Sequence, residues 1–174
     1  MRPRPTRFLL AALLGAAVTV LAADSFAEQR QSETPTTPPD PRVFGTWHLN
    51  PAKSKFRPGP PYRSQVRTYE KDGDGMKTRI KTVYADGRST EVEFTAAYDS
   101  VEYPVSGSQE YDSIRLRKVD SFTSEAVLGH AGKVFATAER TLSEDGMAMT
   151  IVFRTSPLTE TRVDNVMVYD KQKP

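Results

Sequence analysis

The sequence contains no cysteine and only two histidines, His48 and His130. The lack of cysteine excludes disulfide bonds, thiolate metal sites, a cysteine nucleophile and a lipid-modified N-terminal cysteine. Two isolated histidines make a poor transition-metal site, and the sequence has no nucleophile motif or phosphate-binding glycine motif. We therefore expect no catalytic residue, no metal and no cofactor, which favours a non-enzymatic protein.

The sequence has one long apolar run, residues 8–23, and it lies near the N-terminus. Three arginines precede it, and residues 25–27 (Ser-Phe-Ala) offer the small side chains that a signal peptidase recognises. The run is shorter than the roughly 20 residues of a membrane helix, so an uncleaved anchor is the less favoured alternative. We predict a signal peptide over residues 1–27, with cleavage after Ala22 or Ala23 as an alternative. The protein is then expected in the periplasm or outside the cell, with no membrane span after cleavage.

The chain carries little net charge once this leader is set aside. The whole sequence has 24 Lys and Arg against 22 Asp and Glu, a formal net charge of +2. Cleavage after residue 27 removes Arg2, Arg4, Arg7 and Asp24, which leaves equal numbers of basic and acidic residues. A neutral chain lacks the basic surface on which nucleic-acid binding depends. We therefore expect no nucleic-acid partner.

Residues 28–42 are rich in proline and threonine and contain no large apolar side chain, a composition typical of a disordered spacer. The remainder, residues 43–171, shows no sustained helical period. It consists of short runs of alternating apolar and polar residues, separated by turn residues. The expected strands cover residues 43–50, 64–71, 76–84, 88–98, 112–119, 121–129, 132–143, 147–155 and 162–170. Because closure protects the edges of a meander, we predict an all-β domain, a single antiparallel meander closed into a small barrel of 8–10 strands.

The segments 76–84 and 88–98 show how the register follows from this alternation. Pairing of Ile80 with Val92 places apolar side chains on one face and brings Arg79 opposite Glu93 on the other. This register requires a three-residue loop with Gly87 in the left-handed conformation, a G1 bulge. The same alternation elsewhere predicts an interior formed by Trp47, Leu49, Ile114, Leu116, Phe122, Leu128, Val134, Leu142, Met147, Met149, Ile151 and Phe153.

The segment Gly45-Thr46-Trp47 resembles the G-x-W signature of the calycins, the superfamily that includes lipocalins and fatty-acid-binding proteins. In that superfamily the tryptophan packs across the closed end of the barrel, so the resemblance implies that Trp47 closes the barrel. Residues 165–171 also resemble the last strand of fatty-acid-binding proteins. Over nearly all of residues 43–171 the chain is similar to uncharacterised secreted bacterial lipocalin-like proteins. The segments that carry this similarity are GTWHLNPAKSKF, GPPYRSQVRTYE, YPVSG and LSEDGMAMTI.

Two departures from fatty-acid-binding proteins limit what the resemblance implies. Those proteins have a helical lid after the first strand, but four prolines within residues 51–63 exclude a helix there. They also place an arginine two residues before the tyrosine of the last strand, where this chain has Met167. Their carboxylate site is therefore not implied for this protein.

Arg140 is the most prominent candidate for binding a ligand, because its strand places it among inward-facing apolar residues. Ala136 and Ala138 leave room beside it, and an inward arginine can bind an anionic group bidentately. The alternatives are a buried ion pair with an internal carboxylate, or a head group that reaches the rim of the barrel.

Three tyrosines, Tyr84, Tyr98 and Tyr169, also fall on inward faces. Each combines an apolar ring with a hydroxyl that can meet the polar end of a ligand, although packing within the protein is the alternative. Met149 and Phe153 are expected to complete an adaptable apolar lining, although methionines also fill gaps in a solid core.

These residues predict an exported, non-enzymatic protein that binds a small lipophilic molecule inside the barrel, with apolar burial supplying most of the affinity. The alternative is a filled barrel that acts as a structural or protein-interaction module of the cell envelope, without a small-molecule ligand. A cavity of at least ~300 Å³ would favour the binding protein over the filled barrel.

Overall fold

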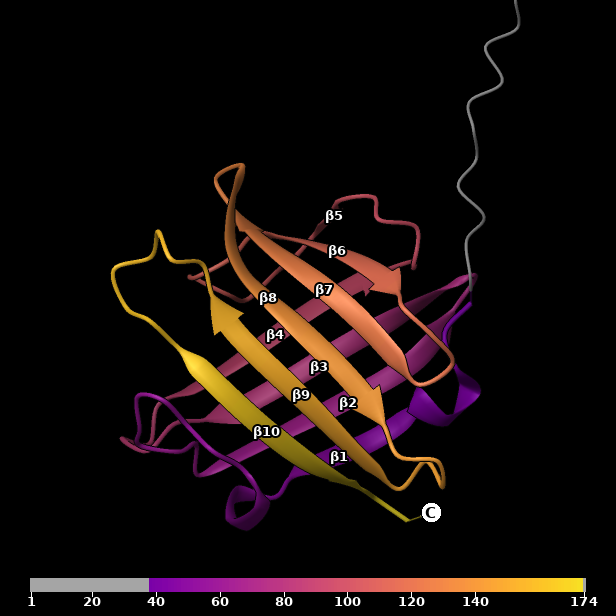
Figure 1. The fold of residues 1–174 in the computed structure, drawn as a ribbon, viewed down its shortest axis with the longest axis horizontal. Coiled ribbons are helices and arrows are strands. Elements are labelled where there is room, and N and C mark those ends of the chain that lie inside the picture. The colour runs from indigo at the N-terminus through magenta and orange to yellow at the C-terminus, as the bar shows by residue number, and fades with distance from the viewer. Residues whose placement is uncertain (1–37, 174) are drawn as a thin grey trace, which may run out of the picture. The chain divides into compact units, whose positions relative to one another are not determined.

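In the computed structural model, which describes residues 38–173, the chain forms ten antiparallel strands and two short 3-10 turns (Figure 1). The strands are β1 (Gly45–Leu49), β2 (Ser64–Asp72), β3 (Gly75–Val83), β4 (Ser89–Ala96), β5 (Tyr103–Pro104), β6 (Ser113–Lys118), β7 (Thr123–His130), β8 (Lys133–Leu142), β9 (Ala148–Thr155) and β10 (Asp164–Lys171). The turns are η1 (Pro41–Val43) and η2 (Pro51–Lys53). The predicted signal peptide lies outside the described residues.

All ten strands belong to one sheet, in the order β4-β3-β2-β1-β10-β9-β8-β7-β6-β5. Figure 1 shows this sheet wrapped on itself, with β7 to β10 crossing in front of β2 to β4. The two ends of the sheet meet where Glu93 of β4 exchanges backbone hydrogen bonds with Ser106, at N–O distances of 2.9 and 3.0 Å. The neighbouring Gly107 has a φ of 79° and lies so close to the Glu91 carbonyl that no side chain fits there. The barrel is therefore nearly closed, and the predicted fold class is confirmed.

The nine expected strands agree with β1 to β4 and β6 to β10 to within two residues at each end. Only β5 was not expected, because a two-residue strand that ends in proline carries no alternation. The β3–β4 hairpin has the predicted register, with Ile80 opposite Val92 and Arg79 opposite Glu93. Its loop contains Gly87 at a φ of 91°, as the G1 bulge requires.

Two residues of the expected interior, Val134 and Met147, are instead exposed, at 46% and 39%. The register between β7 and β8 shifts, so that Leu128 pairs with Ala136 but Gly129 pairs with Val134. Phe135 is thus an extra residue, and such a bulge reverses the inward and outward positions before it. Met147 lies in the turn that precedes β9, where the alternation of the strand has not begun.

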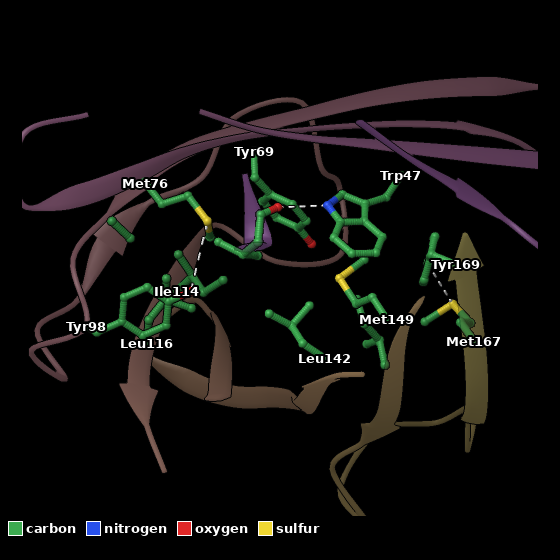
Figure 2. Close-up of a cluster of buried hydrophobic side chains, with 13 residues drawn as sticks. Trp47, Tyr69, Met76, Tyr98, Ile114, Leu116, Leu142, Met149, Met167 and Tyr169 are labelled. Atoms are coloured by element: carbon green, nitrogen blue, oxygen red, sulfur yellow. Dashed lines mark hydrogen bonds between the residues drawn. The ribbon is translucent and has the colours of Figure 1, made fainter. Parts of the chain in front are cut away.

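The end of the barrel that carries the β8–β9 turn, here called the base, is closed around Trp47. The indole of Trp47 is fully buried and donates a hydrogen bond from Nε1 to the Val43 carbonyl at 2.8 Å. Lys171 Nζ lies 5.2 Å from the ring centroid and donates to the Arg42 carbonyl at 2.6 Å. Figure 2 shows Met149 pointing toward the indole from the opposite wall. The base is therefore packed, as expected for a barrel sealed at one end.

Residues 38–42, the last part of the predicted spacer, have a defined structure before β1. Asp40 caps η1 by accepting a hydrogen bond from the Arg42 backbone N–H at 2.8 Å, and its carboxylate also receives two guanidinium hydrogen bonds from Arg42. Arg42 in turn donates to the Glu144 carbonyl and lies 4.7 Å above the Phe122 ring. The side-chain hydrogen bonds of Arg42 lower the pKa of Asp40 to about 2.

We predict that Asp40→Asn destabilises the protein in a pH-dependent way. A carboxyl whose pKa is lowered on folding stabilises the fold above its ordinary pKa, and this contribution disappears as the pH falls toward the folded pKa. The free energy of unfolding should fall by about 0.5–1 kcal/mol at pH 7, the range of a partly exposed ion pair. The difference from the wild type should vanish between about pH 4 and pH 2, as measured by urea unfolding at each pH.

The matched control is Asp74→Asn, in the exposed turn between β2 and β3. It should leave the free energy of unfolding unchanged at pH 7 and at pH 2. An effect of Asp40→Asn that is equally large at pH 2 would contradict the assignment of the ion pair as its cause.

Candidate functional site

The interior of the barrel contains a cavity of about 80 Å³ between β2–β4 and β6–β9. Its volume exceeds the roughly 10–15 Å³ that one water needs, but it lies below the ~300 Å³ typical of pockets for drug-sized ligands. Most of the lining is apolar, and small side chains of β7 and β8, Ser124, Ala126 and Ala138, leave the space open. The volume alone therefore favours a barrel that is largely filled.

The predicted ligand-binding residues divide into two groups of three. Arg140, Tyr98 and Phe153 line the cavity, whereas Tyr84, Tyr169 and Met149 do not. Met149 and Tyr169 are fully buried in the packed core beside the base. Tyr84 lies in an aromatic cluster with Tyr62, at a centroid distance of 5.5 Å, and is covered by the guanidinium of Arg88.

Arg140 points into the barrel from β8, as its alternation predicts. Its Nη2 donates a hydrogen bond to the Tyr98 hydroxyl, and Nη1 makes a long contact of 3.9 Å with the Met76 sulfur. The guanidinium carbon lies 5.3 Å from the Tyr69 ring centroid and 5.8 Å from that of Tyr98. The Nε atom is buried and has no hydrogen-bond partner. Arg140 is thus held by aromatic rings, but its hydrogen-bonding capacity is not used up.

Arg67 of β2 is a second interior arginine that sequence reasoning missed. It lines the same cavity as Arg140. In the register it lies between Trp47 of β1 and Ile80 of β3, both of which point inward. The pairing of β2 with β1 and β3 could have revealed that Arg67 faces inward, because directly paired residues of neighbouring strands share a face. Its own segment hides the signal, since Val66 alternates with it on the outer face.

The hydrogen bonds of Arg67 leave the outer part of its guanidinium available. Nε donates to the Gln65 side-chain oxygen and to the Tyr169 hydroxyl, both at 3.1 Å. The Tyr169 hydroxyl donates in turn to Gln65. Among residues 38–173, every hydrogen bond of Arg67 within normal geometry comes from Nε, while the Tyr69 hydroxyl adds a looser contact with the guanidinium.

Tyr69 lies beside both guanidiniums and connects the two halves of the site. Burial acts to lower the pKa of Arg67, but the phenol oxygens of Tyr169 and Tyr69 outweigh it and raise the pKa above its ordinary value. Burial also acts to lower the pKa of Arg140, but Tyr98 and Tyr69 outweigh it and raise this pKa above its ordinary value. Both arginines are therefore cationic at any physiological pH.

Neither interior arginine has a carboxylate partner within ion-pairing distance among residues 38–173. Glu125 borders the cavity, but its carboxylate accepts a hydrogen bond from Arg117 of β6. The interior ion pair that was an alternative for Arg140 is thus absent from the described residues. The barrel holds two positive charges that the described residues do not neutralise.

The end of the barrel opposite the base, here called the mouth, is covered by aromatic side chains. Tyr111, in the segment before β6, stacks on Phe135 of β8 at a centroid distance of 6.2 Å. Tyr111 also lines the cavity. Burial raises the pKa of Tyr111 to about 12 and that of Tyr62 to about 12. These phenols remain neutral at physiological pH and contribute no counter-charge.

A larger groove of about 900 Å³ lies at the edge of the barrel, under the loop of residues 156–163. It is bordered by Arg57, Arg154 and Arg162, but Arg154 pairs with Asp164 at 3.2 Å and the groove also contains Glu160. All three arginines are exposed to solvent, and two acids lie among them, unlike in the interior. The interior cavity is the better candidate site despite its smaller volume.

A scan against protein-family models gives no match, and a search of curated proteins finds no match either. The nearly closed barrel of ten antiparallel strands is compatible with the calycin fold that the G-x-W segment resembles. Within residues 38–173, no three His, Asp or Glu side chains gather where a metal ion could be held. Nor does this part of the chain contain a helix long and apolar enough to cross a membrane.

We predict that Arg140→Met stabilises the ligand-free protein. Methionine has a similar length, fills irregular space and carries no charge, whereas a partly buried charge without a carboxylate partner lowers the stability. The lost contacts with Tyr98 and Tyr69 offset part of this gain. The free energy of unfolding in urea should rise by about 1–2 kcal/mol.

The control is Arg79→Met on the outer surface, where Arg79 pairs with Glu91 and Glu93. This change should lower the stability by less than about 1 kcal/mol. If Arg140→Met instead destabilised the protein by more than that, Arg140 would be a structural part of the core.

Proposed function

We propose that this protein is a non-enzymatic binding protein that holds a small lipophilic molecule inside its barrel. The observation that carries the proposal is that Arg140 and Arg67 line one interior cavity and have no carboxylate partner among residues 38–173. Buried polar groups are hydrogen-bonded in the great majority of proteins. Two cationic side chains without a counter-charge, beside a space larger than one water, are therefore best explained by a bound molecule.

The cost of the interior charges weighs against a purely structural barrel. Both guanidiniums are partly buried and have no carboxylate partner among residues 38–173. Such a charge costs a part of the several kcal/mol of a fully buried one, and the whole stability of a domain is only about 5–15 kcal/mol. A barrel whose sole purpose is rigidity gains stability from apolar side chains at positions 67 and 140. Retaining two arginines there is understandable if a ligand supplies the missing interactions.

The small volume favours the second candidate, a filled barrel that serves as a structural or protein-interaction module of the cell envelope. One point weighs against the filled barrel. The cavity volume of about 80 Å³ applies to the barrel with both arginine side chains in the cavity lining, and these side chains have several rotatable bonds. Movement of either guanidinium enlarges the space. We therefore rank the binding protein first. A bound ligand accounts for the two interior arginines, and movement of their side chains accounts for the small cavity volume.

The proposal extends to class and location. We propose a lipocalin-like protein that is exported to the periplasm or beyond, on the basis of the G-x-W segment and the apolar run that follows three arginines. Tyr98 and Phe153 then contact the ligand together with Arg140, while Trp47 closes the base.

Native mass spectrometry of the full chain, expressed with its own N-terminal segment and purified without detergent, tests the binding function. We expect a discrete excess mass that disappears on denaturation, or saturable uptake of the neutral apolar probe N-phenyl-1-naphthylamine. Ala138→Phe fills the cavity at the side of Arg140 and should abolish both.

The matched control is Thr137→Phe, one residue away on the same strand and exposed on the outer face. It adds an aromatic ring but leaves the cavity open, so binding should persist. If the wild type carries no extra mass and takes up no probe, the binding function is wrong and the envelope module remains.

A further inference from the structure

We infer that the ligand carries an oxyanion group, a carboxylate, sulfate or phosphate, and that Arg67 and Arg140 bind this group together. The inference rests on the proposed binding function and adds the chemical class of the ligand. It follows from how two guanidiniums on opposite walls of the barrel are held.

The two arginines come from β2 and β8 and line one cavity. Tyr69 lies beside both, since its ring faces Arg140 at 5.3 Å and its phenol oxygen helps to raise the pKa of both arginines. Tyr98 fixes Arg140 through its hydroxyl, and Tyr169 fixes Arg67 in the same way. The side chains are thus anchored by neutral groups and not by acids.

The donors that remain free identify the missing group. They are the two terminal nitrogens of Arg67 and the N–H groups of Arg140 Nη1 and Nη2 that the Met76 sulfur and the Tyr98 hydroxyl do not use. All of these atoms donate hydrogen bonds and none accepts. A neutral hydroxyl or carbonyl can satisfy one donor at a time. An oxyanion has several acceptor oxygens and also neutralises the charge, so it fits both arginines at once.

The surrounding acids do not supply this anion. Asp40 and Asp120 line a small pocket together with Arg140, but Asp40 pairs with Arg42, and Asp120 accepts hydrogen bonds from backbone N–H groups. Glu125 is paired with Arg117, and the exposed Glu110 lies near the mouth, where its charge contributes to the raised pKa of Tyr62 and Tyr111. Neither forms an ion pair with an interior arginine. The space available, about 80 Å³, suits a compact group of a few non-hydrogen atoms rather than a large hydrophobic body. Any longer apolar part of the ligand has to extend toward Tyr111 at the mouth.

The test measures the melting temperature of the full chain as a function of added ligand, because a ligand that binds only the folded state raises it in a saturable way. The ligands are sodium sulfate, sodium phosphate and sodium hexanoate, each compared with sodium chloride at equal ionic strength. Neutral hexanol is compared with the buffer alone. The proteins are the wild type, Arg67→Met, Arg140→Met, Arg140→Lys, the cavity-filling variant Ala138→Phe and the surface control Arg79→Met.

We expect at least one oxyanion to raise the melting temperature of the wild type and of Arg79→Met with saturation. The apparent affinity should fall at least about tenfold in Arg67→Met and in Arg140→Met, the loss expected for one charge-assisted hydrogen bond. Arg140→Lys keeps the charge but loses the planar fork and should bind with intermediate affinity. An effect of sulfate or phosphate identifies a free oxyanion as sufficient, whereas an effect of hexanoate alone identifies the acidic end of an amphiphile.

The inference is overturned if no oxyanion gives a saturable rise, or if the rise is the same in both methionine variants as in the wild type. The result with hexanol shows whether only the oxyanion inference fails or the proposed binding function fails as well. If hexanol stabilises the wild type but not Ala138→Phe while every oxyanion fails, the barrel binds neutral ligands. If hexanol fails as well, both proposals fall. Should Arg140→Met not fold, Arg67→Met and Arg140→Lys carry the same test.

Discussion

A nearly closed antiparallel barrel allows each strand residue only two directions, inward or outward, and the rest of the structure depends on this constraint. Arg67 lies in the register between Trp47 and Ile80, which are both buried, so its side chain has to enter the interior. Arg140 is placed in the same way opposite Ile151 of β9. The two interior charges are therefore a consequence of strand pairing across the sheet.

The interior accommodates these charges with aromatic groups. Tyr69, Tyr98 and Tyr169 place ring faces or hydroxyls against the guanidiniums, which recovers part of the hydration that burial removes. Tyr169 cannot cancel the charge, because burial raises its pKa and keeps the phenol protonated. The packed base around Trp47 provides stability at one end, so the middle of the barrel can remain incompletely filled.

Most of the fold could be predicted from the sequence, because alternation and turn chemistry act over a few residues. The hairpin around Gly87 shows this, since one register satisfies the apolar face, the charged pairs and the left-handed turn together. Val134 was placed on the wrong face because the bulge beside Phe135 depends on the pairing of β7 with β8, which the alternation of one strand does not reveal. The two-residue β5 depends in the same way on its partner β6.

The candidate site was only half visible in the sequence. Arg140 was found because its own strand is otherwise apolar and small, so local alternation determined its inward direction. Arg67 was hidden, because polar residues surround it and only its pairing with β1 and β3 decides its face. Tyr84, Tyr169 and Met149 point inward or pack in the core, yet none lines the cavity, because position along the barrel axis follows from how all ten strands are staggered. The sequence by itself determined the barrel and one of its interior charges. Only the tertiary structure decided that a second arginine faces the same cavity and that the described residues supply no carboxylate for either, since both facts depend on strands distant in the chain.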